Sequence, residues 1–144
     1  LIHFGGWKKL NDKKISKIQF NALLMEKLTL KLENIIDIYG FTEQLGTVYP
    51  SFGDSGNLVP IYSDVIIRDP NTLKPVQDGN LGLVQFISPI PHSYPGISLL
   101  NDDIGRIIPT PENYRNIKQF EIIGRPDTAE SRGCGDTLPN DYYI

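Results

Sequence analysis

Short β-forming runs dominate the chain after Gly46, and prolines and glycines separate them. Runs of this length without helical patterns between them predict strands that follow one another directly. Such strands form antiparallel sheets. We therefore expect an antiparallel sheet or half-barrel built from residues 47–50, 58–68, 81–89, 97–100, 105–108 and 120–123.

Two turn signals lie inside this region. Asp69-Pro70-Asn71 and Asp78-Gly79-Asn80 combine residues that favour tight turns, and they bracket a hairpin region. Ser51 to Asn57 contains glycine and serine, but no Walker-type lysine and helix follow it, so we interpret it as a loop.

The part before Gly46 has a different pattern. Leu1 to Phe4 and Ile35 to Ile38 are strand-like, and a helix is predicted between them. Its start is marked by Ser16 and Gln19, which have the spacing of a capping box. Apolar residues at helical spacing predict packing into the core: Phe20, Leu23, Leu24 and Leu28. The fold class is thus α/β in the mixed α+β sense, with an α/β layer followed by the antiparallel half-barrel.

The stretch from Tyr39 to Gly46 changes abruptly from apolar to polar at Gly40. Polar groups at the carboxyl end of a strand lie where open α/β sheets bind ligands. The Thr42 hydroxyl can bond a phosphate oxygen, and the Glu43 carboxylate can bind Mg²⁺. The alternative is a helix start, with Thr42 as the N-cap and Glu43 in the first turn.

Two glycine-containing loops are further candidates. Gly5 and Gly6 end the first predicted strand and would let a ligand approach the backbone closely, with Trp7 beside it. The alternative is a glycine turn with a core tryptophan. Ser88 to Gly96 is too rich in proline for a strand and predicts a stiff surface loop, whose His92 and Tyr94 could contact a ligand. A rigid crossing without a ligand is the other possibility.

Charged residues near the end of the chain complete the set. Asp103, before an Ile-Gly pair, could hold a vicinal diol, although an Asp-rich turn explains the same pattern. Arg125 ends a predicted strand with a cation suited to phosphate or ribose oxygens. Cys134 lies between two glycines in a polar tail, which argues against the buried setting usual for a lone cysteine.

Composition excludes several functions. The 144 residues carry a net charge of −3 with a pI near 5.3, so we expect no nucleic-acid partner. One cysteine and two distant histidines offer no zinc spacing. No apolar run reaches the length of a membrane span, so we expect no stable membrane insertion and a cytoplasmic location. Because the strand-like Leu1 to Phe4 opens the chain without an initiator Met, we expect a fragment of a longer protein.

In this order, the motifs resemble the carboxy-terminal half of the LuxE-type acyl-protein synthetases. This family belongs to the adenylate-forming superfamily, which also includes the phenylacetate-CoA ligases. The matching segments span nearly the whole chain: Phe4 to Leu10, Tyr39 to Tyr49, Gly82 to Gln85, Pro91 to Gly96, Leu99 to Ile107, and Gly124 to Cys134.

The resemblance implies ATP-dependent activation of a long-chain fatty acid to acyl-AMP, followed by thioester formation and delivery to an acyl-CoA-type reductase. ATP and Mg²⁺ would be required. Catalytic roles would fall to Thr42 at the α-phosphate, Glu43 at Mg²⁺ and Cys134 as acyl acceptor. The nucleotide would contact Gly5, Gly6, Tyr39 at adenine, Gly40, Thr42, Asp103 at the ribose and Arg125, and Asp127 would match the hinge of the small domain.

The chain departs from the superfamily pattern at two points. The Ser/Thr/Gly-rich loop that cradles the triphosphate is absent, and the residues after Gly133 are too few for the usual small domain. We therefore divide the chain into residues 1–133, the second half of an adenylation domain, and residues 134–144, a tail that carries Cys134. We expect the 144 residues alone to be inactive. A CoA ligase of the phenylacetate type and an inactive binding module remain as alternatives.

Overall fold

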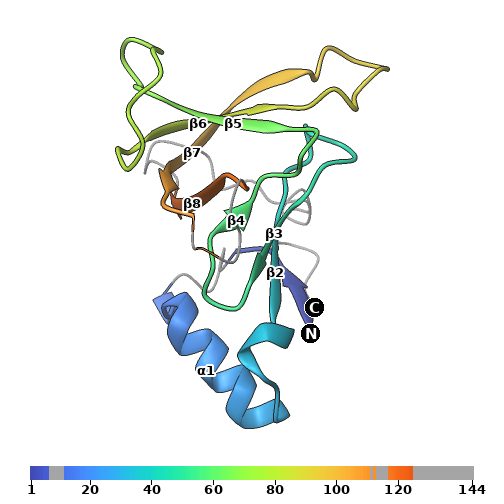
Figure 1. Cartoon of the computed structure of the whole chain (residues 1–144), viewed down its shortest axis with the longest axis vertical. Coiled ribbons are helices and arrows are strands. Elements are labelled where there is room, and N and C mark those ends of the chain that lie inside the picture. Colours follow the sequence, from blue (N-terminus) through green and yellow to red (C-terminus); the bar gives the residue numbers. More distant parts are fainter. Residues whose placement is uncertain (7–11, 111, 113–116, 125–144) are drawn as a thin grey trace, which may run out of the picture.

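The computed structural model describes residues 1–6, 12–110, 112 and 117–124. Two sheets meet in this part of the chain (Figure 1). Sheet A has the strand order β1-β2-β3, and sheet B has the order β4-β8-β7-β6-β5. The elements in chain order are β1 Ile2–Phe4, α1 Lys17–Leu28, the 3₁₀ helix η2 Leu32–Asn34, β2 Ile36–Tyr39, β3 Tyr49–Phe52, β4 Asn57–Leu58, β5 Asp64–Arg68, β6 Gly82–Ile87, β7 Ser98–Ile108 and β8 Gln119–Gly124.

Sheet A contains the expected α/β portion. Strands β1 and β2 are parallel, and the predicted helix α1 lies between them in sequence. The capping box is confirmed: Gln19 N donates to Ser16 Oγ at 3.2 Å, and Ser16 N donates to Gln19 Oε1 at 2.9 Å. The helix ends at Leu28 because Thr29 adopts a left-handed conformation with φ 53°.

The prediction that α1 packs into the core through its apolar stripe is wrong. The only buried residue of the helix is Asn21, and Leu28 is 53% exposed. The half-buried Phe20 meets the His3 ring edge-on at 5.3 Å. Polar contacts hold the helix instead, because Lys17 Nζ donates to Ser55 O at 3.0 Å and also to Ser51 Oγ. Figure 1 places α1 at the end of the molecule opposite β5 and β6.

Sheet B confirms the expected antiparallel half-barrel, with some changes at the strand boundaries. The β5–β6 hairpin lies where the two turn signals predicted it. The expected run 58–68 is divided into β4 and β5, because the chain turns after Pro60, with Ser63 N donating to Pro60 O at 2.9 Å. Ser51 and Phe52, which we had placed in a loop, belong to β3.

The expected runs 97–100 and 105–108 join into the single strand β7, so the Asp-rich turn proposed for the segment between them does not form. The register between β7 and β8 shifts at Ile104 and Gly105. Glycine is required at this irregularity, because a Cβ on Gly105 would lie 2.5 Å from Glu121 O. Asp103 thus lies within β7, in the stretch between Leu100 and Ile104 where the register with β6 also shifts.

The hydrophobic core belongs mainly to sheet B, and sheet A reaches it through the adjacent ends of β2 and β3. Tyr49 of β3 is fully buried in this core, and Tyr39 and Phe41 pack against it. The other buried members of the cluster are Val59, Val65, Ile67, Val84, Phe86, Ile107 and Phe120. Among the helices that the structure describes, none combines the length and apolar character needed to cross a bilayer.

Candidate functional site

The carboxyl ends of β1 and β2 lie side by side at one edge of sheet A. Phe4 pairs with Ile38 in parallel register, so the Gly5-Gly6 pair and the Tyr39-Gly40 pair leave the sheet at the same edge. Gly5 has φ +98°, a conformation that favours glycine. A Cβ at Gly5 or Gly6 would meet no described atom within 4 Å, so the backbone here is open to close approach. Trp7, expected beside it, lies outside the described residues.

Tyr39 connects this edge to sheet B. Its hydroxyl donates to Asp103 Oδ2 at 2.5 Å and accepts from Asn101 Nδ2 at 3.1 Å. Its ring stacks on Phe86 with centroids 5.7 Å apart and meets Phe120 edge-on at 5.9 Å. Two predicted site residues that are 64 positions apart in sequence are thus in direct contact.

Asp103 is 6% exposed, although it carries a carboxylate. A buried polar group needs hydrogen-bond partners, and the Tyr39 hydroxyl is one of them. Asn101 fixes this segment as well, because its Oδ1 accepts from Asp103 N at 3.2 Å.

The segment after Gly40 is a turn, and no helix starts at Thr42, so the helix-start alternative is wrong. Gln44 points inward and is only 2% exposed, while Thr42 and Glu43 are exposed. Gln44 Oε1 accepts from the Tyr49 hydroxyl at 2.9 Å. Burial raises the pKa of Tyr49, which keeps this hydroxyl protonated as a donor.

The proline-rich loop contacts the same turn from its other side. The Tyr94 hydroxyl donates to Glu43 O at 2.7 Å and accepts from Leu45 N at 3.1 Å. Tyr94 was predicted as a ligand contact, and the structure shows it bonded to backbone. His92, the other predicted contact in this loop, is exposed.

Sequence reasoning missed two residues of this site. Gln44 is hard to find because an amide in a polar stretch looks like a surface residue, yet its Nε2 is buried and has no hydrogen-bond partner among the described residues. Asn101 was overlooked because a turn was expected around it. A strand pattern with period two through Ser98 to Ile108 would have placed Asn101 and Asp103 on one face.

Three predicted residues cannot be placed relative to this site. Arg125, Asp127 and Cys134 lie outside the described residues. The roles assigned to all the candidate residues therefore stay predictions, and what the structure adds is the contact between the β2 end and β7.

The acidic side chains of the described residues show what kind of Mg²⁺ site this chain could form. Within residues 1–6, 12–110, 112 and 117–124, no group of three or more His, Cys, Asp or Glu side chains could hold a metal ion. Mg²⁺ in nucleotide sites is commonly held by one or two carboxylates together with substrate phosphates. The exposed Glu43 carboxylate fits such a site, whereas a cage made entirely of protein ligands does not.

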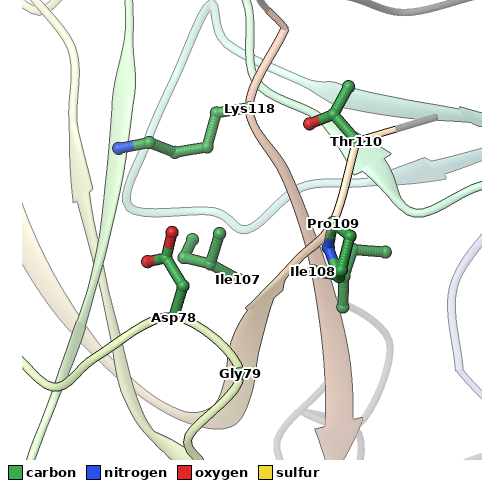
Figure 2. Close-up of a pocket in the computed structure, with 7 residues that line it drawn as sticks. All are labelled: Asp78, Gly79, Ile107, Ile108, Pro109, Thr110 and Lys118. Carbon is green, nitrogen blue, oxygen red and sulfur yellow. The ribbon is translucent and has the colours of Figure 1, made fainter. Parts of the chain in front are cut away.

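A cavity of about 410 Å³ lies away from these residues, beside the carboxyl-terminal end of β7 (Figure 2). Asp78 and Lys118 project into the same space from opposite sides. Lys118 Nζ already donates to Asp64 Oδ1 and, at 3.2 Å, to Val65 O. None of the candidate nucleotide residues described above lines this cavity.

Comparison with known proteins identifies a family that matches nearly the whole chain. The family described as "Acyl-protein synthetase, LuxE" matches residues 1–143. The long-chain-fatty-acid–luciferin-component ligase of Vibrio harveyi is 36% identical over 135 residues, which are 93% of this chain and 35% of that protein. The ligase of the same name from Aliivibrio fischeri is 32% identical over 143 residues, 97% of this chain and 37% of that protein. The chain thus spans about a third of the length of these curated relatives.

Solved structures share the fold at low sequence identity. Apo MatB from Rhodopseudomonas palustris has a TM-score of 0.57 at 14% identity, over 88% of this chain and 25% of that one. McyG A-PCP complexed with phenylalanyl-adenylate has a TM-score of 0.54 at 15% identity, over 88% and 24%. The ATP-bound RpMatB-BxBclM chimera B3 has a TM-score of 0.54 at 16% identity, over 75% and 23%. The expected fold class, a mixed α+β fold with an antiparallel half-barrel, is confirmed.

Proposed function

Because the chain belongs to the LuxE acyl-protein synthetase family, we propose that it is the carboxy-terminal part of an enzyme that activates a long-chain fatty acid with ATP. The named ligases among its relatives support fatty-acid activation. The chain spans about a third of these relatives, which supports its being part of a longer enzyme, and we assign residues 1–133 to the second half of an adenylation domain. Residues 134–144 would be the tail that presents Cys134 as acyl acceptor.

The first reaction joins two anions. A carboxylate oxygen of the fatty acid attacks the α-phosphorus of ATP, and the bond to pyrophosphate breaks, which leaves acyl-AMP. Two anions approach each other only if their charges are neutralised by groups fixed in advance. Thr42 would donate to the α-phosphate and Arg125 to ribose or phosphate, and Glu43 would hold Mg²⁺, which supplies positive charge to the phosphates when bound.

The second reaction transfers the acyl group. The Cys134 thiolate attacks the acyl carbon, AMP leaves, and a thioester forms. An acyl-CoA-type reductase would accept the chain from this thioester. Asp127 would be the hinge that allows a change between the two reactions. We also place the enzyme in the cytoplasm.

The observation that carries the proposal is the hydrogen bond between Tyr39 and Asp103. It joins the carboxyl end of β2, where the Thr42 and Glu43 turn begins, to the acid that we assign to the ribose hydroxyls. Gly5, Gly6 and Gly40 leave sheet A at the same edge. A nucleotide that lay along this edge could meet the adenine-facing Tyr39, the ribose-binding Asp103 and the phosphate-binding turn in one orientation.

The acyl acceptor is tested with labelled fatty acid and ATP on the full-length polypeptide. We expect a protein adduct that hydroxylamine removes and that Cys134→Ser abolishes. Turnover that depends on CoA and is unchanged in Cys134→Ser would identify a CoA ligase instead. The 144-residue chain by itself should show no ATP–pyrophosphate exchange, and robust exchange would contradict the division into two halves.

The nucleotide site is tested by calorimetry with an acyl-adenylate analogue. Asp103→Ala should lose binding, whereas Asp102→Ala, on the adjacent and exposed residue of β7, should keep it. Equal binding by both variants would remove Asp103 from the site. No binding by the wild-type polypeptide would favour the inactive module.

A further inference from the structure

The turn that carries Thr42 and Glu43 is held by the proline-rich loop between β6 and β7. Ser88 Oγ and Thr47 Oγ1 are hydrogen-bonded at 2.9 Å, and both side chains are buried. A Cβ on Gly46, which has φ +85°, would lie 2.9 Å from Ile90 Cγ2, so the two loops are in close contact there. The base of the turn is therefore fixed against this loop.

The tip of the turn is held by one hydroxyl. Tyr94 Oη donates to Glu43 O at 2.7 Å and accepts from Leu45 N at 3.1 Å. These two backbone groups flank Gln44, whose side chain is anchored inside by Tyr49. Only a group that donates and accepts at once can make both bonds, and a phenolic hydroxyl is such a group.

The Tyr94 ring is held in place by its own loop. A Cβ on Gly96 would lie 2.2 Å from Tyr94 Cε2, so the absence of a side chain at position 96 makes room for the ring. Gly96 N donates to Tyr94 O at 2.8 Å, which closes the loop beneath it. Pro89, Pro91 and Pro95 each fix one φ angle, so the loop loses little backbone freedom when it orders.

We propose that Tyr94 is a positioning residue that sets the backbone of Glu43 and thereby aims its carboxylate. The proposal rests on the proposed function, because it concerns the residue assigned there to Mg²⁺. A ligand on a flexible turn must be ordered when the substrate binds, and a fixed turn avoids that cost. Tyr94 itself would touch neither the metal nor the nucleotide, since its hydroxyl is bonded to backbone.

The test is Tyr94→Phe in the full-length polypeptide, with Tyr62→Phe as control. Tyr62 is an exposed tyrosine in the connection before β5. Tyr94→Phe should accelerate hydrogen exchange of the Leu45 amide about two- to tenfold, as expected for the loss of one hydrogen bond. It should also raise the Mg²⁺ concentration needed for half-maximal acyl-AMP formation several-fold, while Tm changes by a few degrees. Tyr62→Phe should change none of these.

A second variant reaches the same contact differently. Gly96→Ala keeps the Tyr94 hydroxyl but displaces the ring, so it should shift Leu45 exchange and the Mg²⁺ dependence in the same direction. Unchanged Leu45 exchange in Tyr94→Phe would overturn the proposal, and so would faster exchange with an unchanged Mg²⁺ dependence. If the wild type forms no acyl-AMP, the proposed function fails, whereas the Leu45 exchange still decides whether Tyr94 holds the turn.

Discussion

The two sheets differ in how far their apolar side chains are covered. Sheet B surrounds a core in which Phe86 and Phe120 are fully buried. Sheet A has one face against α1 and sheet B, while on its other face Ile2 and Phe4 are exposed, Phe4 by 82%. Parallel strands such as β1 and β2 are normally covered on both faces. An apolar pattern therefore shows which side chains favour burial, and it does not show what covers them.

The candidate site lies where sheet A, which has an exposed apolar face, meets the buried core of sheet B. Tyr39 and Tyr49 come from sheet A, yet their rings pack among the aromatic side chains of sheet B. The turn after Gly40 is held by the hydroxyl of Tyr49, whose ring is buried against sheet B, and by the β6–β7 loop. Although one face of sheet A is exposed, Gln44 and Tyr49, which hold this turn, are buried.

The largest expected effect is the difference in stability loss between a core variant of sheet B and a variant on the exposed face of sheet A. Phe86→Ala removes a fully buried ring that meets four other aromatic rings, so it should lower the free energy of unfolding by about 3–5 kcal/mol. Phe4→Ala removes an exposed ring and should change it by no more than about 0.5 kcal/mol. Urea titration of both variants measures this. Equal losses would mean that Phe4 is covered in solution and would break the comparison.

Glycines give a second contrast. A Cβ on Gly82 would lie 2.3 Å from Arg68 O across the β5–β6 pair, so Gly82→Ala should cost about 1–3 kcal/mol through overpacking. Gly6→Ala meets no atom of the described residues within 4 Å and should change stability by about 1 kcal/mol or less. Thermal denaturation of the two variants provides the measurement. A larger loss at Gly6 than at Gly82 would show that the edge of sheet A is crowded.

The junction between the sheets is tested at Tyr39. Tyr39→Phe keeps the ring but removes the donor to the buried Asp103, so it should lower the free energy of unfolding by about 1–3 kcal/mol. In the double mutant with Asp103→Ala, the two losses should not add, because each change removes one partner of the same hydrogen bond. Denaturant titration of the single and double mutants decides this. Additive losses would indicate that the contact contributes nothing of its own.

The smallest effect concerns the polar attachment of α1. Burial lowers the pKa of Lys17 below its usual 10.5, with Asp37 and Asp54 acting in the opposite direction. The unfolded chain therefore binds more protons just below pH 10.5, and the free energy of unfolding should rise with pH there as the burial cost disappears. Lys17→Met should flatten this slope, while the exposed Lys27→Met should preserve it. If Lys17→Met leaves this pH dependence of the free energy of unfolding unchanged, a group other than Lys17 causes it.

Much of the local structure followed from short-range patterns. The capping box at Ser16 and Gln19 fixed the start of α1, because both its bonds join residues three apart. The strand-like run at Ile35 to Ile38 and the hairpin between β5 and β6 were also predicted. The role of the helix stripe was wrong, since Leu28 has the spacing of a core residue but lies exposed. The alternative of a turn at Asp102-Asp103 was wrong as well, because Ser98 to Ile108 form one continuous strand.

By itself, the sequence determined the family, the mixed α+β fold class and the candidate residues of a nucleotide site. Those properties depend on side-chain chemistry and on spacing along the chain. The tertiary structure decided that Tyr39 meets Asp103, that Gln44 turns inward and that Tyr94 holds the backbone of Glu43. These contacts join residues as far as 64 positions apart, and only the packing of sheet A against sheet B brings such groups within hydrogen-bonding distance.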